Sequence, residues 1–572
     1  MDLGLPPTLT MSRANANGIP YEWRWPPLPV GFPRRGFSHP FQAPWPNRGR
    51  SEAAKEHPRT ILELRMCALS HRIREIPRWW EEMRIAERWR EDVLEEVEND
   101  VDGQQIWKLT PRMVDYVLEE LKGYADLRDP ETGIEVGPAE RIWKSDKLIP
   151  SSLRERLLSA VASLENVPDP EKDWGPGSDR SVLKLVDPSL YPIVLGRTKA
   201  QGIGYARGGR PTSGKFQMLP SDFFVDPDGK VTLRSPYINN VHPTRDKGLY
   251  SVIPEALQLA LPMFERVLSD TIRPLLRMRI VTSAKRGQLV EESADCIWDG
   301  DVVCPNPSGK DEYNNHPEQW FAKHSFRTPD AREHYDGDLE VMKDRISLRD
   351  RTLQVIVKLT NIVLTPESPR YSGEGWHVEG MPNETIVSNF VYYYDSENVT
   401  ESRMAFRRAI SKPRDHDQGD VACMRVLYNM VPRSPLVQDV GDVITKAHRC
   451  VAFPNLYQRR CQPFELQDPT KPGHMKILSL FLVDPTWRVP SASDVAPQQQ
   501  SWVIDAMRGA GANSLFARLP DEILAVIAER LDEKMSRSEA EKYRDKMGAE
   551  SVAFVTENNK DIFEVEYRLN GN

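Results

Sequence analysis

Cysteine, long apolar runs and surplus positive charge are all scarce in this sequence of 572 residues. Its six cysteines are scattered and form no Cys-x-x-Cys pair, which argues against a zinc module or a disulfide framework and indicates a reducing, cytoplasmic setting. No segment approaches 18 uninterrupted apolar residues, so we expect neither a signal peptide nor a membrane span. The net charge of −8 offers no electrostatic footprint for nucleic acid.

Both ends of the chain differ in composition from its middle. Residues 1–55 contain ten prolines together with Trp23, Trp25 and Trp45. Proline blocks helix formation, and tryptophan is enriched at interfaces, so we expect an extended arm that docks on its own domain or on a partner. Residues 501–572 have helical patterns and are predicted to form a C-terminal helical extension.

Residues 56–180 are predicted to form a helical region. Thr60 is followed three positions later by glutamate, which makes a capping box, and Thr110 precedes a proline in the way that an N-cap precedes the first helical residue. Ser152, again with glutamate three residues later, is expected to open a further helix. These signals indicate a layer of helices preceding the strands.

Residues 181–500 contain the strand signals. The stretch TLQVIVKLTNIVLTP at 352–366 alternates as a half-buried strand does. The segment 400–445 is interpreted as a long polar loop. Because short strands separated by long loops are typical of a double-sheet roll, this region is the expected core. Further strands are expected at 385–395, 449–455 and 476–484.

A histidine two residues from a carboxylate occurs three times, as His316-x-Glu318, His334-x-Asp336 and His377-x-Glu379. Chance alone gives roughly 1.6 such matches in a chain of this composition, so the spacing by itself has little weight. Only His377-x-Glu379 follows one strong strand signal and precedes another. On an extended strand the two side chains would point to the same face and could share a metal ion.

A second motif, GGRPTSGKF at 208–216, nearly matches a phosphate-binding loop. That loop requires serine or threonine after the lysine, to bind magnesium, and a helix that begins there. Here Phe216 follows Lys215. We therefore favour an ordinary glycine-rich loop over a nucleotide site.

Several long phrases are distinctive, among them DPETGIEVGPAERIWKSD, FQMLPSDFFVD, WHVEGMPNETIV and AFPNLYQ. Through them, residues 60 to 550 resemble a large fungal family catalogued as a domain of unknown function. The core of that family is similar to the double-stranded β-helix of Fe(II)/2-oxoglutarate-dependent oxygenases. The resemblance implies an α+β fold with a jelly-roll, cupin-like core, an N-terminal helical layer and a C-terminal helical extension.

The metal site that the resemblance implies is incomplete in this chain. His377 and Glu379 stand at the first two ligand positions, but Arg459 stands where the family pattern has the distal histidine. A guanidinium stays protonated and has no lone pair for iron. Because a buried carboxylate must be paired or coordinate a metal, we expect Arg459 to fill the metal position and to lie within about 6 Å of Glu379.

The position implied for the co-substrate anchor is altered as well. Met475 stands where the resemblance implies an arginine that would hold 2-oxoglutarate. Lys476 is the neighbouring cation, but it should face the opposite side of a strand. Gly175 and Asp187 also replace residues that are histidines in the family pattern.

Two functions follow from these departures. The first is a non-catalytic protein, either a partner subunit of an oxygenase paralogue or a repurposed secondary-metabolism protein, as a homo- or hetero-dimer. The alternative is an active non-haem Fe(II) oxidoreductase that acts on a small organic substrate. In that case His448 or His474 would be the third ligand, and Lys476 would hold the co-substrate. Candidates for lining the cavity are Tyr237, Asn239, Asn361 and Tyr392.

Overall fold

The fold is described from a computed structural model. It describes residues 31–33, 36–41, 55–82, 90, 91, 94, 108–200, 215–273, 276–280, 320, 323, 328–413, 421–509, 514–531 and 533–568.

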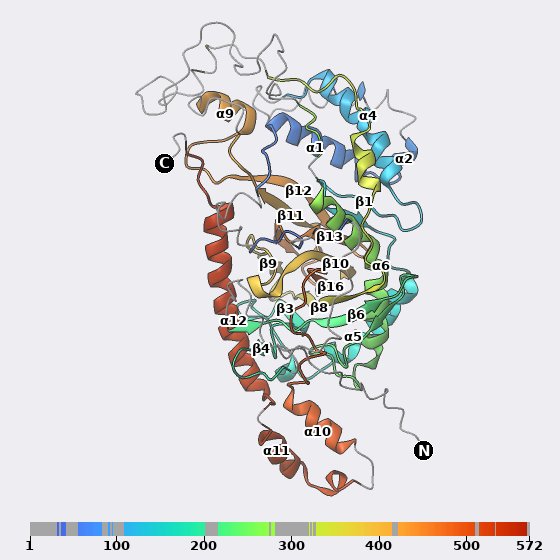
Figure 1. The fold of residues 1–572 in the computed structure, drawn as a ribbon, viewed down its shortest axis with the longest axis vertical. Helices are drawn as coiled ribbons and strands as arrows, with labels where there is room; N and C mark the ends of the chain where they lie inside the picture. Colours follow the sequence, from blue (N-terminus) through green and yellow to red (C-terminus); the bar gives the residue numbers. More distant parts are fainter. Residues whose placement is uncertain are drawn as a thin grey trace, which may run out of the picture.

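Nine strands of the described residues form one antiparallel sheet, the main sheet (Figure 1). Its order is β1-β2-β13-β10-β16-β8-β6-β7, and β3 pairs with β8 beyond the part that β6 occupies. The strands β8, β10, β13 and β16 are the four that the sequence predicted. Their apolar runs are recognisable because side chains on both faces of these strands are buried. The strands are β1 Glu135–Val136, β2 Trp143–Ser145, β3 Val182–Val186, β6 Ser221–Val225, β7 Val231–Leu233, β8 Arg351–Leu364, β10 Ile386–Glu397, β13 Cys450–Pro454 and β16 Gly473–Val483.

A smaller sheet with the order β12-β11-β14 packs against one face of the main sheet, which we call the inner face. Side chains of both sheets share one apolar cluster, in which the rings of Phe406 and Phe453 lie 5.0 Å apart. The strands are β11 Ser402–Ala409, β12 Val437–Thr445 and β14 Gln458–Cys461, and two further pairs are β4 Ile193–Val194 with β5 Phe216–Gln217 and β9 Arg370–Tyr371 with β15 Phe464–Glu465.

The prediction of a polar loop at 400–445 is wrong. This segment contains β11, β12 and the helix α9 (Val421–Tyr428). Six of the eight residues of β11 are buried, including the charged Arg408, and only Arg403 and Arg407 keep partial exposure, so the arginines concealed a largely buried strand.

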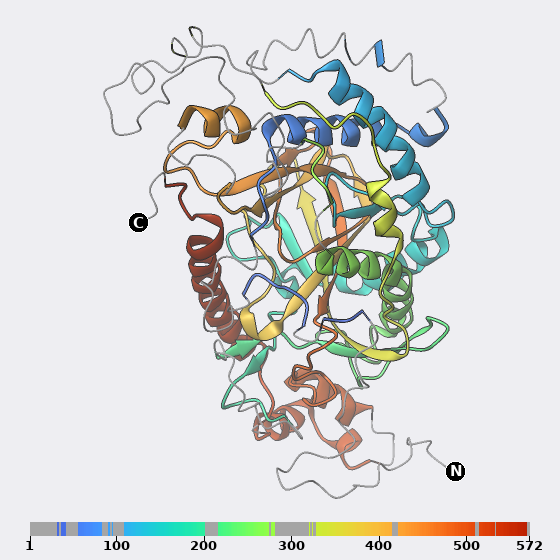
Figure 2. The same cartoon turned by 45° about the horizontal axis from the view of Figure 1, so that its top comes forward.

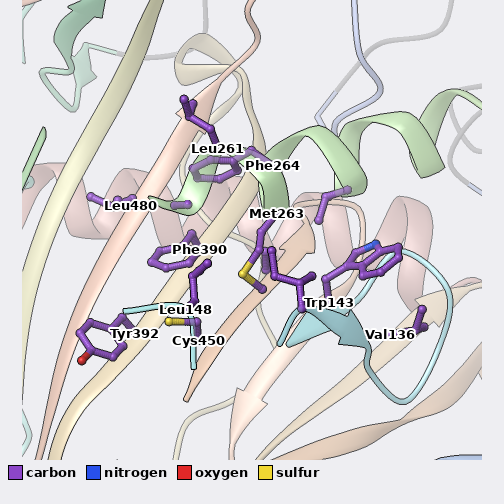
Figure 3. Close-up of a cluster of buried hydrophobic side chains, with 14 of the residues drawn as sticks. Val136, Trp143, Leu148, Leu261, Met263, Phe264, Phe390, Tyr392, Cys450 and Leu480 are labelled. Carbon is purple, nitrogen blue, oxygen red and sulfur yellow. The ribbon is translucent and has the colours of Figure 1, made fainter. Parts of the chain in front are cut away.

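Helices cover the opposite, outer face of the main sheet. Figure 3 shows this contact: Phe264 of α6 lies against Phe390 of β10, with ring centroids 6.1 Å apart. The side chains of Thr60 and Thr110 cap α1 and α4 as expected, whereas α5 begins at Ser151 with Pro150 at the N-cap, so the cap predicted at Ser152 is wrong. The helices are α1 Ile61–Arg74, α2 Trp79–Glu82, α4 Pro111–Leu127, α5 Ser151–Glu165 and α6 Lys247–Ile272.

Two features of the outer face were not expected from the sequence. The helix α6 runs through Pro254 and Pro262, which ordinarily disfavour a helix interior, yet most of its side chains between Leu249 and Asp270 are buried. The region expected to be helical also supplies β1 and β2, and β2 pairs with β13. The division of the chain into four regions stays a prediction.

The C-terminal region is helical, as predicted. The long helix α12 runs along one side of the two sheets while α6 lies on the other, as both views show (Figures 1 and 2). Within the described residues, no helix has both the length and the apolar character needed to cross a membrane. The elements are α10 Gln500–Arg508, α11 Asp521–Glu529 and α12 Arg537–Asn558, with short turns of helix at η4 Asp169–Glu171, η5 Asp338–Lys343, η6 Pro382–Glu384, η7 Phe516–Arg518 and η8 Asn559–Phe563.

Part of the N-terminal arm docks on the core. Phe32 and Phe37 are buried, and the backbone N–H of Phe37 donates to Asp484 Oδ2 at 3.0 Å. Trp23, Trp25 and Trp45 lie outside the described residues.

Candidate functional site

The segment that carries the His377-x-Glu379 pair is held against β14 by backbone hydrogen bonds. The N–H of His377 donates to the Arg459 carbonyl at 3.1 Å, and the N–H of Arg459 donates back to the His377 carbonyl at 3.0 Å. Gly373 enters this segment with φ +80°, and a Cβ there would lie 2.7 Å from the Cys461 carbonyl oxygen. The register and this glycine therefore place the pair directly beside Arg459.

The guanidinium of Arg459 lies between two carboxylates, those of Glu374 and Glu379. Its Nη2 donates to Glu379 Oε1, and its Nη1 donates to Glu374 Oε2 at 2.9 Å. The imidazole of His377 lies alongside, with Nε2 3.8 Å from the same Glu379 oxygen. The pairing of Arg459 with Glu379 that the sequence predicted is therefore present.

This ion pair is largely shielded from water. The side chains of Arg459 and Glu379 are 11% and 13% exposed. Burial, the largest single effect, would raise the pKa of Glu379, but the charge of Arg459 together with His377 and Lys358 outweighs burial and holds the pKa well below its usual value. The two carboxylates in turn raise the pKa of Arg459 against the effect of its own burial. The guanidinium is a permanent cation at this position.

Asn455, which directly follows β13, fixes the backbone of Glu379 from the other side. Its Oδ1 accepts the Glu379 N–H at 2.9 Å, and its Nδ2 donates to the Glu379 carbonyl at 2.9 Å. The side chain is buried, so these bonds have little competition from water. Asn455 is a positioning residue for the carboxylate.

A second acid, Glu384, is buried one turn beyond the pair. Its carboxylate accepts the backbone N–H groups of Met218 at 2.6 Å and Met381 at 2.7 Å. Burial, with a smaller contribution from the charge of Glu379, raises the pKa of Glu384 to about 7. This carboxyl therefore titrates near neutral pH, in contrast to Glu379.

The two residues near the expected co-substrate anchor face opposite sides of β16. Met475 is fully buried in the apolar cluster of the inner face. Lys476 lies on the outer face, where its Nζ is 2.9 Å from Glu165 Oε1 of α5. The structure therefore does not bring Lys476 to the His377–Glu379 pair, because successive residues of a strand point to opposite faces.

Neither of the two alternative histidines joins the pair. His474 lies on the outer face of β16, with Nε2 2.8 Å from Asp395 Oδ2. His448 is in the turn before β13, and Asn455 is at the other end of that strand, so a strand length of roughly 16 Å separates it from the Glu379 backbone. Within the described residues, no three His, Cys, Asp or Glu side chains are grouped so that they could hold a metal ion.

The four candidate cavity residues are distributed over the fold rather than gathered around one site. The Tyr237 hydroxyl donates to the Val495 carbonyl at 2.8 Å, and the Asn239 amide donates to backbone carbonyls of the 190–191 turn. On the outer face, the Asn361 amide donates to Glu165 Oε1 at 2.6 Å. Tyr392 is also on that face, in the cluster that α6 covers (Figure 3).

The remaining motifs lead to no site. His334 is 76% exposed, and His316 lies outside the described residues. Strand β5, not a helix, follows Lys215, and a nucleotide-binding loop would require a helix there. The glycines of that motif lie outside the described residues.

Comparison with known families decides the classification. Residues 111–506 match the family described as "Protein of unknown function (DUF4246)". The chain belongs to this family. No match was found among curated proteins.

The solved structures that are similar to this DUF4246 member match it weakly. A bsmA homologue from Methylobium petroleophilum PM1 has a TM-score of 0.16 at 13% identity, covering 25% of this chain and 45% of its own. IDO from Bacillus thuringiensis has a TM-score of 0.16 at 12% identity, covering 26% and 53%. The Fe(II)/(alpha)ketoglutarate-dependent dioxygenase TqaL has a TM-score of 0.21 at 11% identity, covering 59% and 90%. The chain thus matches about half the length of the first two proteins.

Three residues that shape the site in this DUF4246 member were missed by the sequence reasoning. Glu374 shares Arg459 with Glu379, and Asn455 fixes the Glu379 backbone. Lys358, on the inner face of β8, contributes to lowering the pKa of Glu379. Only Glu374 had a local signal, since it lies three residues from His377.

Proposed function

We propose that this DUF4246 member has a double-stranded β-helix core of the Fe(II)/2-oxoglutarate oxygenase kind and that it is not an iron-dependent catalyst. The observation that carries the proposal is the Arg459 guanidinium bound between Glu374 and Glu379. Two antiparallel sheets that share one apolar interior support the fold assignment.

The residues at the site do not fit Fe(II). Facial iron sites use two histidines and one carboxylate and leave positions open for co-substrate and oxygen. Here one histidine, His377, lies beside two carboxylates, but the side chain between those carboxylates offers only N–H donors, and the described residues contain no group of three His, Cys, Asp or Glu side chains that could hold a metal ion. A divalent cation at Glu379 would also face the charge of Arg459, and it would have to displace a hydrogen-bonded, largely buried ion pair.

Arg459 performs the electrostatic task that a metal would otherwise perform. It bonds to both carboxylates, balances one of their two negative charges and, with Lys358 and His377, keeps Glu379 ionised, while Asn455 holds the backbone in place. The site is therefore organised without a metal. We propose that it binds a small organic molecule rather than oxidising one. A partnership with an intact oxygenase paralogue stays a prediction.

An anaerobic Fe(II) titration by calorimetry, followed by a 2-oxoglutarate turnover assay, tests this function. The wild-type protein is expected to show no stoichiometric Fe(II) binding and no 2-oxoglutarate consumption. Arg459→His restores an imidazole and is expected to gain Fe(II) affinity, whereas the matched control Arg459→Lys retains the cation and should not. Stoichiometric Fe(II) binding with turnover by the wild type would contradict the proposal.

A further inference from the structure

A cavity of about 800 Å³ lies between β3 of the main sheet and the C-terminal helices α10 and α12. Its wall consists of β3, the end of α5 and the residues after η4 on one side, and of the first turns of α12 and α10 on the other. We call it the α12 cavity. Its volume is within the range of cavities that hold small molecules, and the residues that line it do not include those of the Arg459 site.

The charges on the wall of the α12 cavity balance one another. Five acidic and five basic side chains line it, so the cavity has no surplus charge that would select an ion. Most of these side chains also have an oppositely charged partner. Asp173 Oδ1 lies 2.6 Å from Arg544 Nη1, and Asp187 Oδ2 lies 2.7 Å from Lys184 Nζ. Because paired ions attract neither an anion nor a cation strongly, the wall favours a neutral ligand.

Two buried donors on the wall have no acceptor. The indole N–H of Trp174 and the Nε–H of Arg544 are unbonded within the described residues. The two side chains are neighbours, because Arg544 donates to the carboxylate of Asp173, the residue before Trp174. Buried polar atoms in native proteins nearly always have partners, so these donors indicate an oxygen atom of a ligand or of ordered water.

A hydroxyl group lies at the same end of the cavity. Tyr191 is 5% exposed and lines the cavity, and its hydroxyl makes no hydrogen bond within the described residues. Burial raises the pKa of Tyr191, and the smaller, opposite effects of Arg537 and Glu541 indicate that the hydroxyl is close to α12. Arg537 Nη2 in turn lies 3.3 Å from Asp173 Oδ2. A hydroxyl that can donate or accept therefore accompanies the two unbonded donors.

Farther along the wall, an acceptor lacks a donor. Gln499 is 2% exposed, and its Oε1 is unbonded within the part of the chain that the structure describes. Its amide nitrogen donates to Asn240 Oδ1 at 3.0 Å, and the Asn240 amide donates to the Asp187 carbonyl at 2.7 Å. Asp187 Oδ2 is 3.7 Å from Arg544 Nη1. These three contacts join Gln499 to the donor end, so a ligand needs separate groups for each.

An aromatic side chain lies beside this acceptor. Trp502 follows Gln499 by three residues, in the first turn of α10, and is partly exposed on the wall. Contacts with the rings of Tyr237 and His242, at 5.9 and 5.2 Å between centroids, fix its orientation. The flat apolar surface of an indole suits the C–H face of a sugar ring, whose hydroxyl groups both donate and accept.

We propose that the α12 cavity binds a neutral disaccharide. One sugar ring lies at the donor end, where its oxygen atoms accept from Trp174 and Arg544 and a hydroxyl bonds to Tyr191. The other ring packs against Trp502 and donates a hydroxyl hydrogen to Gln499. This binding function is additional to the one proposed for the Arg459 site and does not depend on it.

Calorimetric titration of the full chain with maltose, cellobiose, lactose and sucrose tests the class of ligand. At least one of these disaccharides is expected to bind saturably at millimolar concentration. Adenosine is the control, because it is neutral and forms hydrogen bonds but has only one sugar ring, and it should bind more weakly. The affinity for the disaccharide should be the same at about 0.05 M and about 0.5 M NaCl, because salt screens only charges.

Substitutions at the donor end test the contacts. Tyr191→Phe removes one hydroxyl and keeps the ring, so binding of the disaccharide should weaken roughly two- to tenfold. Trp174→Phe removes the indole N–H and should weaken binding by a similar factor, and it decides the matter if Tyr191→Phe fails to fold. Tyr543→Phe is the matched control: this tyrosine is on α12 but outside the lining of the cavity, with its ring 6.1 Å from that of Phe216, and the variant should bind as the wild type does.

Four results would overturn the proposal. They are no saturable binding of any of the disaccharides, tighter binding of adenosine than of every disaccharide, an affinity that changes several-fold with salt, or wild-type affinity in both Tyr191→Phe and Trp174→Phe. The first would leave ordered water as the partner of the unbonded atoms. Because none of these measurements involves iron, their outcome is independent of the Fe(II) titration, which tests the proposed function alone.

Discussion

Replacing Arg459 with methionine is expected to destabilise the protein and to reverse the effect of pH at Glu379. Removing one partner of a buried pair costs about 3–5 kcal/mol. Because the two side chains are 11% and 13% exposed and Lys358 and His377 remain nearby, we expect a smaller loss, about 2–4 kcal/mol at pH 7.5.

The sign of the pH dependence follows from the lowered pKa of Glu379. In the wild type, the contribution of Glu379 to stability is fully present above the unfolded-state pKa of about 4.3 and is lost as pH falls through the lower folded-state pKa. Without Arg459, burial dominates and raises the pKa of Glu379, so the ionised form becomes a penalty. The stability difference between wild type and Arg459→Met should therefore be largest near neutral pH and should shrink as pH falls through the raised pKa of Glu379 in the variant towards about pH 4.

Urea unfolding, followed by tryptophan fluorescence at pH 7.5, 5.5 and 4, measures this difference. Arg370→Met is the matched control, because Arg370 pairs with Glu465 at 2.7 Å but the side chains are 79% and 48% exposed. Such a surface pair should contribute less than about 1 kcal/mol. Equal losses for the two variants, or a loss for Arg459→Met that does not change with pH, would refute the reasoning.

Two further changes test how the site is positioned. Asn455→Ala removes both hydrogen bonds to the Glu379 backbone and should lower the free energy of unfolding in urea by about 2–3 kcal/mol. A loss below about 0.5 kcal/mol, the scale of an ordinary surface substitution, would contradict the positioning role of Asn455. Gly373→Ala places a Cβ 2.7 Å from the Cys461 carbonyl oxygen on a backbone with φ +80°, and it should lower the free energy of unfolding by about 1–3 kcal/mol. Gly375→Ala is the control and should be tolerated, because its added Cβ meets nothing within 4 Å.

The sequence predicted the parts of the fold that depend on local pattern. The apolar runs of β8, β10, β13 and β16 and the threonine caps are visible in single stretches of sequence. The helix α6 was missed because of its two internal prolines, and β11 because three of its eight residues are arginines, one of which is buried. In both cases burial against other elements overrode the local signal.

The candidate site was predictable only in part. The contact of Arg459 with Glu379 followed from charge, because a buried carboxylate that has no metal ion requires another cation. The positions of Asn455 and Lys358 depend on strand register across distant segments, which no local pattern encodes. By contrast, the alternation of side chains along a strand did predict that Lys476 faces away from Met475, and it lies on the outer face.

The most direct test of the central claim is a crystal structure of the wild-type protein grown anaerobically with excess Fe(II), with an anomalous map at the iron edge. We predict no anomalous peak beside His377 and Glu379, and the Arg459 guanidinium in contact with both Glu374 and Glu379. An iron peak bound by His377 and Glu379, with Arg459 turned away from them, would contradict the account.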